Sequence, residues 1–224
     1  MKHLRSTLSA GLLLAAIAVA PAPADAAFVE GVAAYNRGDF AAAAEIWRQD
    51  AANGDAAAQR NLGLLYLNGQ GVPKDEAAAA EWFRRSSDQG FPRASASLAE
   101  MYLRGVGVPK DAERAVSLYQ RAAEAGLPEA QHNLAILIEA GFGAPKDPEL
   151  ARRWFQRAAA GGHEAARERL RRMEPQDDGD DIAVEADDSA GEPTDAASGD
   201  LPRVDQAGDG GLVDSLHAIL SPSD

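Results

Sequence analysis

Cysteine is absent from this chain of 224 residues, and aromatic residues make up only 6% of it. Without cysteine the chain can form no structural disulfide, no thiolate metal site and no cysteine nucleophile. Basic residues are also scarce, because 22 Lys and Arg stand against 35 Asp and Glu and leave a formal net charge of −13. Phosphate binding needs clustered Lys and Arg. We therefore expect no nucleic acid among the partners of this protein.

Long apolar runs are lacking too, apart from one short run near the N-terminus. Lys2 and Arg5 precede an apolar stretch from Leu8 to Ala20, and a small-x-small sequence ends at Ala26. This order is typical of a secretory signal peptide, and about a dozen apolar residues fall short of the roughly 20 that a membrane-spanning helix needs. We interpret residues 1–26 as a signal peptide. The mature chain is then expected to be exported, periplasmic or extracellular, without stable membrane insertion.

The sequence does contain an internal repeat with a period of 36 residues. Its most regular columns are Gly69, Gly105 and Gly141; Gly71, Gly107 and Gly143; Pro73, Pro109 and Pro145; Lys74, Lys110 and Lys146; and Asp75, Asp111 and Asp147. Each unit is interpreted as two helices, since apolar residues recur at helical spacing on both sides of this turn. The glycines end the first helix, and Asp75 is well placed as the N-cap of the second. One unit cannot bury its own apolar face, so stacked units must supply the core.

The columns predict an all-α solenoid with defined unit boundaries. We expect an N-terminal tetratricopeptide-like capping unit at 27–54, repeats at 55–90, 91–126 and 127–162, and a C-terminal capping helix at 163–172. Beyond the repeats the composition changes: from Met173 to Asp224 there are 15 acidic residues and one basic residue, a net charge of −14 (1 − 15), whereas the region from Phe28 to Arg172 holds 19 of each. A segment this polar cannot offset its chain entropy by burial, so 173–211 is predicted to be a disordered acidic linker.

The final segment, 212–220, is different because it is apolar. Its leucines and isoleucine would share one face of a helix: Leu212, Leu216, Ile219 and Leu220. One interpretation is a short docking helix, for a groove on a partner or for the concave face of the repeats themselves. The other is residual hydrophobicity in a disordered chain end. A third hypothesis is self-assembly through this segment.

Catalytic and metal-binding constellations are hard to find in the sequence. His132, His163 and His217 have no other His or Cys at metal-ligand spacing, and the glycine-rich turns follow no strand, so they are not phosphate loops. We therefore predict no catalytic residue, no cofactor, no metal site and no enzymatic activity.

The candidate binding surface is the concave face formed by the first helices of the stacked units. The residues predicted to bind protein there are Asn61, Leu64, Asn68, Arg93, Ser97, Glu100, Arg104, Glu129, Asn133 and Ile136. A mixed polar and apolar groove suits a peptide or a helical partner. The alternative is an ordinary solvated face.

The run Ala58 to Tyr66, followed by Gly69, Gly71, Asp75 and Trp82, resembles the Sel-one-like repeat (SLR) family. This family is a longer-turn relative of the tetratricopeptide repeat, and the resemblance covers about Phe28 to Arg172. It implies a right-handed superhelix that scaffolds protein–protein contacts. Bacterial members are often exported, and some resemble regulators of membrane sensor kinases. The resemblance thus implies an exported adaptor for an envelope sensor or assembly. The alternative is a cell-wall-directed hydrolase or binder, as in a cysteine-rich subgroup linked to penicillin binding, and the absence of Cys argues against it.

Overall fold

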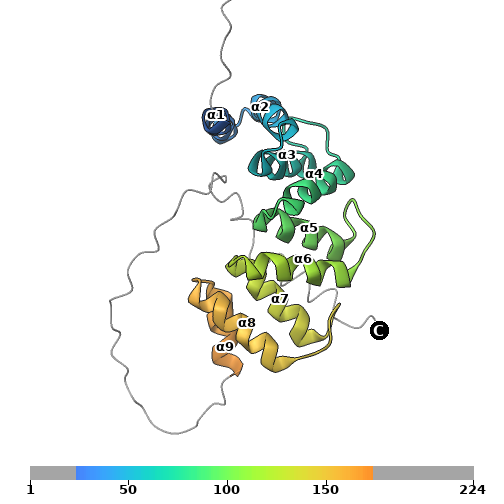
Figure 1. Ribbon diagram of the computed structural model, residues 1–224, viewed down its shortest axis with the longest axis vertical. Helices are drawn as coiled ribbons and strands as arrows, with labels where there is room; N and C mark the ends of the chain where they lie inside the picture. Colours follow the sequence, from blue (N-terminus) through green and yellow to red (C-terminus); the bar gives the residue numbers. More distant parts are fainter. Residues whose placement is uncertain (1–23, 174–224) are drawn as a thin grey trace, which may run out of the picture.

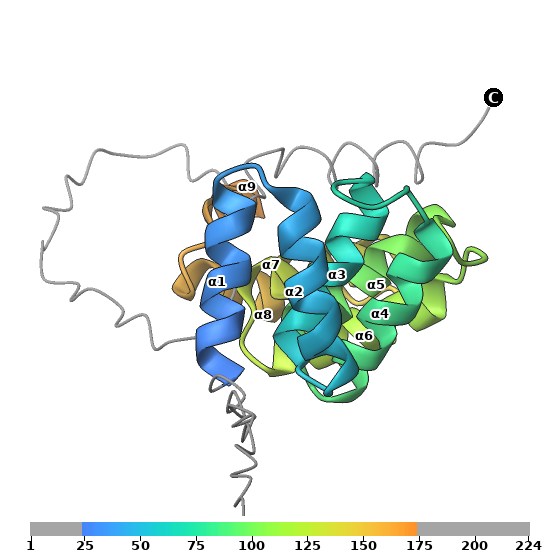
Figure 2. The same ribbon diagram turned by 90° about the horizontal axis from the view of Figure 1, so that it is seen from above.

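The structure, a computed structural model, describes residues 24–173, and this part of the chain is a stack of helices in chain order (Figure 1). The helices are α1 (Ala24–Asn36), α2 (Phe40–Ala52), α3 (Ala56–Asn68), α4 (Glu76–Asp88), α5 (Pro92–Arg104), α6 (Ala112–Glu124), α7 (Pro128–Ala140), α8 (Pro148–Ala160) and α9 (Glu164–Met173). The pairs of helices that pack extensively are all successive in the chain. Seen from above, α1 to α4 are displaced progressively sideways, so the stack turns as it proceeds (Figure 2). The predicted all-α solenoid is confirmed.

One aromatic side chain of each second helix anchors the core at intervals of 36 residues. These side chains are at most 1% exposed: Trp47, Phe83, Tyr119 and Phe155. They pack against a column of small residues on the preceding helix. At Gly63 an added Cβ would lie under 3.0 Å from the Phe83 ring, so a larger residue there would displace the ring. Burial of each large apolar side chain contributes about 1.5–3 kcal/mol, and the repeat places one such anchor in every unit.

The turn within each repeat contacts the repeat before it. Gly69 ends α3 in the left-handed conformation, with φ of 68°, and Asp75 caps α4 by accepting a hydrogen bond of 2.9 Å from the Ala78 N–H, as predicted. Gly107 has φ of 67°, and a Cβ there would lie under 3.0 Å from the Glu76 carbonyl oxygen at the start of α4. Gly71 and Gly143 make the same approach to the starts of α2 and α6, so this glycine column fixes how neighbouring repeats stack.

The solenoid ends at α9, which has no following helix to pack against among residues 24–173. The position that matches Gly63 in the first repeat is Arg171 in α9, an exposed side chain paired with Glu168. A charged residue in place of a small one closes the apolar face, as a capping element of a repeat protein must. Within this same part of the chain, no helix is both long and apolar enough to cross a bilayer.

Several predictions concern residues outside the described part of the chain. Most of the predicted signal peptide falls in residues 1–23, and α1 begins at Ala24, so cleavage after Ala26 would remove the first three residues of α1. Of the predicted linker 173–211, only Met173 is described, at the end of α9. The predicted docking helix at 212–220 lies wholly outside the described residues.

Candidate protein-binding groove

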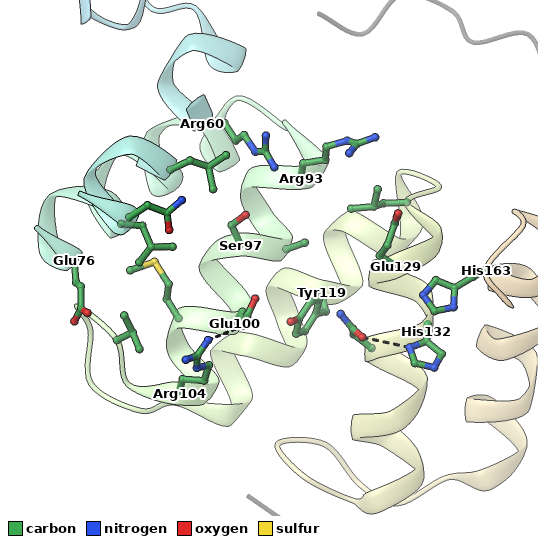
Figure 3. Close-up of a pocket in the computed structure, with 18 of the residues that line it drawn as sticks. Arg60, Glu76, Arg93, Ser97, Glu100, Arg104, Tyr119, Glu129, His132 and His163 are labelled. Carbon is green, nitrogen blue, oxygen red and sulfur yellow. Dashed lines mark hydrogen bonds and ion pairs between the residues drawn. The ribbon is translucent and has the colours of Figure 1, made fainter. Parts of the chain in front are cut away.

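The first helices of the three repeats, α3, α5 and α7, line a groove of about 780 Å³. Figure 3 shows Arg60 and Arg93 at one end of it and His132 and His163 at the other, with Tyr119 between them. The side chains that reach it come from the same face of each first helix, which the 36-residue period brings into line. Other lining residues come from outside the first helices, among them Tyr119 of α6 and His163, which precedes α9 and closes the far end.

The structure places eight of the ten predicted binding residues around this groove: Leu64, Asn68, Arg93, Ser97, Glu100, Arg104, Glu129 and Asn133. The prediction that Asn61 lies on the exposed face is wrong, because its side chain is fully buried. The Arg60 guanidinium donates to the Asn61 amide oxygen at 3.4 Å, and Arg60, itself only 5% exposed, lines the groove in place of Asn61. Ile136 is half-buried and packs against the core of the third repeat instead of lining the groove.

Apolar side chains concentrate in the half of the groove between α3 and α5. Leu64 and Leu67 come from α3, Ala96 and Met101 from α5, and Val106 from the turn after α5. We call this strip the apolar half of the groove. Because α3 and α5 belong to different repeats, the strip exists only where two repeats stack. It offers an anchor for apolar side chains of a bound segment.

The groove lining includes charged side chains of both signs. Four basic residues stand against three acidic ones: Arg60, Lys74, Arg93 and Arg104 against Glu76, Glu100 and Glu129. Two ion pairs form within the lining, one between Arg104 and Glu100 at 3.0 Å and one between Lys74 and Glu76 at 2.8 Å. The lining therefore carries a net charge of +1 (4 − 3) with its histidines neutral. A surface of this kind favours recognition of a polar and apolar peptide over binding of a uniformly charged polymer.

Tyr119 of α6 supplies a polar floor in the middle of the groove. Its side chain is 1% exposed, and burial, with the nearby Glu100 carboxylate, raises the pKa of its hydroxyl well above the usual range. The hydroxyl therefore stays protonated at any physiological pH. A hydroxyl held neutral in this way can take part in hydrogen bonds but does not act as a base.

Two histidines meet at the far end of the groove. The rings of His132 and His163 stack with centroids 4.3 Å apart, and the rings of His132 and Phe155 pack edge-to-face with centroids 5.6 Å apart. His163 Nδ1 also accepts a hydrogen bond of 3.3 Å from the Ala166 N–H, which caps α9. In the described part of the chain, no three side chains of the metal-binding types are grouped to hold an ion. The sequence analysis did not predict this stack. The only signal in the sequence was that His163, at the start of the next unit, follows His132 of the first helix α7 by 31 residues.

A family model for the Sel1 repeat matches residues 56–91, 92–127 and 128–163. A solved structure of a Sel1 repeat protein from Oxalobacter formigenes is 43% identical with a TM-score of 0.54, and the match covers 56% of this chain and 95% of that one. The chain belongs to the Sel1 repeat family. Proteins of this family are typically scaffolds for protein interactions and generally have no catalytic activity of their own.

A second solved Sel1-type structure is a protective antigen present in uropathogenic Escherichia coli strains, which displays an SLR fold. It is 33% identical with a TM-score of 0.64, and the match covers 67% of this chain. This Sel1 repeat protein spans only 33% of the length of that antigen. Among curated proteins, none matches the chain.

The three Sel1 repeats differ from one another where they face the groove. The column of Arg60 continues as Ala96 and His132, and the column of Leu64 continues as Glu100. The third member of the second column, Ile136, packs against the core. By contrast, the glycine, proline and aspartate columns of the turn are identical in all three repeats. Packing therefore holds the turn residues constant, whereas each repeat presents a different surface to the groove.

Proposed function

We propose that this Sel1 repeat protein is an exported adaptor whose groove binds one particular segment of another protein. The observation that carries the proposal is the variation of the groove columns between repeats. A basic, a small and an imidazole side chain follow one another at Arg60, Ala96 and His132. A ligand that matches them must itself change along its length.

The same variation argues against a cell-wall polymer as the ligand. A polymer of identical units is best matched by repeats that present identical chemistry at identical spacing. Here the second repeat offers Ser97 and the ion pair of Glu100 with Arg104, and the third offers Glu129 beside the histidine stack. A protein segment, in which every residue differs from the next, fits such a lining better than a glycan does.

Binding would combine apolar contacts, which supply affinity, with hydrogen bonds, which select the partner. Apolar side chains of the partner fill the apolar half of the groove, and polar groups of the partner meet Tyr119 and Asn133 further along. Because Tyr119 is buried, a partner that leaves this region without matching hydrogen bonds loses affinity. The signal-peptide pattern at the N-terminus supports a partner in the cell envelope, such as a sensor or an assembly factor.

Matched serine substitutions test the role of the groove. Ser97 lines the groove on α5, whereas Ser117 is exposed on α6 and does not line it. Ser97→Arg fills the groove, and Ser117→Arg makes the same chemical change elsewhere. Full-length protein of each type is used to capture partners by photo-crosslinking in the periplasm, and the affinity for the captured protein is then measured with purified components.

We expect one envelope protein to be captured by the wild type and by Ser117→Arg, and its affinity to fall at least tenfold in Ser97→Arg. Equal capture by both variants would move the binding surface away from the groove. If no protein is captured and the purified chain binds or cleaves cell-wall fragments, the adaptor function is wrong and a cell-wall function replaces it.

A further inference from the structure

The apolar half of the groove is bordered by charged side chains, of which more are basic than acidic. Leu64 and Leu67 of α3 and Ala96 of α5 line it, and Figure 3 shows Arg60 and Arg93 at the same end of the groove. Lys74 and Arg104 also reach the lining, each with a carboxylate beside it. An apolar strip with a basic border suits a short amphipathic segment that carries acidic residues and no basic ones.

The chain itself contains such a segment after the repeats. Five apolar residues fall at the spacing of one helical face: Leu212, Val213, Leu216, Ile219 and Leu220. Asp214 lies within this segment, and residues 204–224 contain four acidic residues and no Lys or Arg. No other part of the sequence beyond Met173 combines this apolar pattern with acidic charge, because 174–211 is almost entirely polar or small.

We propose that segment 212–220 binds in cis to the apolar half of the groove and so competes with the partner protein. This inference rests on the proposed function, in that it takes the groove to be a site for a protein segment. The segment would lay Leu216 and its apolar neighbours against Leu64, Leu67 and Met101. Its acidic residues would then approach the basic border.

The length of chain between the repeats and the segment permits this contact. Residues 174–211 number 38 (211 − 174 + 1), and 38 residues span at most about 130 Å. From α9 to α5 there are four helix-to-helix steps, which at about 8–10 Å each amount to roughly 40 Å. A tether that comfortably exceeds its span gives an effective concentration on the order of a millimolar or somewhat less. At that concentration, a segment with a Kd of about 0.1 mM would occupy the groove about nine-tenths of the time.

The absence of cysteine allows a direct test in the full-length chain. One variant carries Ser97→Cys in the groove and Ser215→Cys in the segment, and the control carries Ser117→Cys with Ser215→Cys. Ser117 lies two residues before Tyr119, about 200° away around α6, so it faces away from the groove. Disulfide formation within one chain is followed over time under mild oxidation at low protein concentration. A third protein adds Leu216→Asp to the first pair, and this residue is not one of those that form the repeats.

We expect the Ser97 pair to form its intramolecular disulfide at least ten times faster than the Ser117 pair, and Leu216→Asp to remove this advantage. Equal rates for the two pairs would overturn the inference, and so would disulfides formed mainly between two chains, which would make a second copy the occupant. If the rates are equal while Ser97→Arg still abolishes partner capture, the adaptor function stands and only the intramolecular contact is wrong.

If the Ser97 pair reacts faster, Leu216→Asp should also raise the affinity for the captured partner severalfold. An unchanged affinity would show that the segment does not compete.

Discussion

His163 joins the last helix to the third repeat, because its ring stacks on His132 at 4.3 Å while its Nδ1 atom accepts a hydrogen bond from the Ala166 N–H. One side chain thus closes the end of the groove and caps α9. Asn is a good N-cap but cannot stack, whereas Ala can do neither.

His163→Ala should therefore be less stable than His163→Asn by about 1 kcal/mol, the usual contribution of an N-cap. Urea denaturation measures the difference, and hydrogen exchange of the α9 amides shows where it arises. Equal stabilities for the two variants would mean that the hydrogen bond to Ala166 contributes nothing.

Substitutions at Gly107 and Gly90 separate two costs of an added Cβ atom, the steric clash with a neighbour and the strain of a positive φ. Both have a positive φ, but a Cβ at Gly90 would meet nothing within 4 Å, whereas one at Gly107 would lie under 3.0 Å from the Glu76 carbonyl oxygen. Gly90→Ala should destabilise by about 1–2 kcal/mol through the left-handed conformation alone. Gly107→Ala should cost about 2 kcal/mol more, because the second repeat must move away from α4. Thermal and urea unfolding of both variants measure this, and equal losses would show that the contact is not tight.

A hydrogen bond that links neighbouring units has a different donor in the second repeat. Gln59 donates to the Ala51 carbonyl oxygen at 3.1 Å, and Gln131 donates to that of Ala123 at 3.0 Å. The matching residue in the second repeat, Ser95, is too short to reach the Ser87 carbonyl. Arg121 of the following helix donates to that oxygen instead, at 3.2 Å.

Arg121→Ala should destabilise the protein by about 1 kcal/mol, since it leaves the Ser87 carbonyl without this donor. In the background of Ser87→Ala with Ser95→Gln, which restores the pattern of the other repeats, the same change should have almost no effect. A double-mutant cycle by urea denaturation measures the coupling. Additive effects would show that Arg121 does not replace the missing glutamine.

Asp50 is expected to destabilise the protein at neutral pH. Partial burial, and then the charge of Asp55, raise its pKa above the ordinary 3.8, and its Oδ2 atom is buried without a hydrogen-bond partner. A carboxyl whose pKa is raised by folding favours the folded state only when protonated, so its ionisation lowers stability as the pH rises through that pKa.

Asp50→Asn should therefore raise the free energy of unfolding at pH 7 by a few tenths of a kcal/mol, a small value because solvent screens the site. The gain should disappear when the pH is lowered below about 4, where wild-type Asp50 is itself protonated. Unfolding measured at both pH values decides this, and a gain that persists at low pH would have another cause.

The fold was predictable from the sequence because its determinants are local and repeated. Asp75 as a cap and Gly69 as a helix end depend on neighbours in the chain, and the period then fixes the stack. The site was only partly predictable. Asn61 was assigned to the surface from its position on a helical wheel, yet its side chain is fully buried and Arg60 lines the groove instead. A helical wheel does not show which of two neighbouring side chains will be buried. The stack of His132 on His163 is a contact between units, which the spacing within a unit does not reveal.

The contact of each turn glycine with the start of an earlier helix also bears on how such a protein can change in length. A 36-residue unit carries both halves of this contact, the glycine that fits against the unit before it and the helix start that receives the unit after it. A duplicated unit inserted between any two others would therefore find both neighbours already complementary. Duplication could lengthen the groove by whole repeats without a compensating substitution, and the inserted copy could then diverge at its groove columns alone.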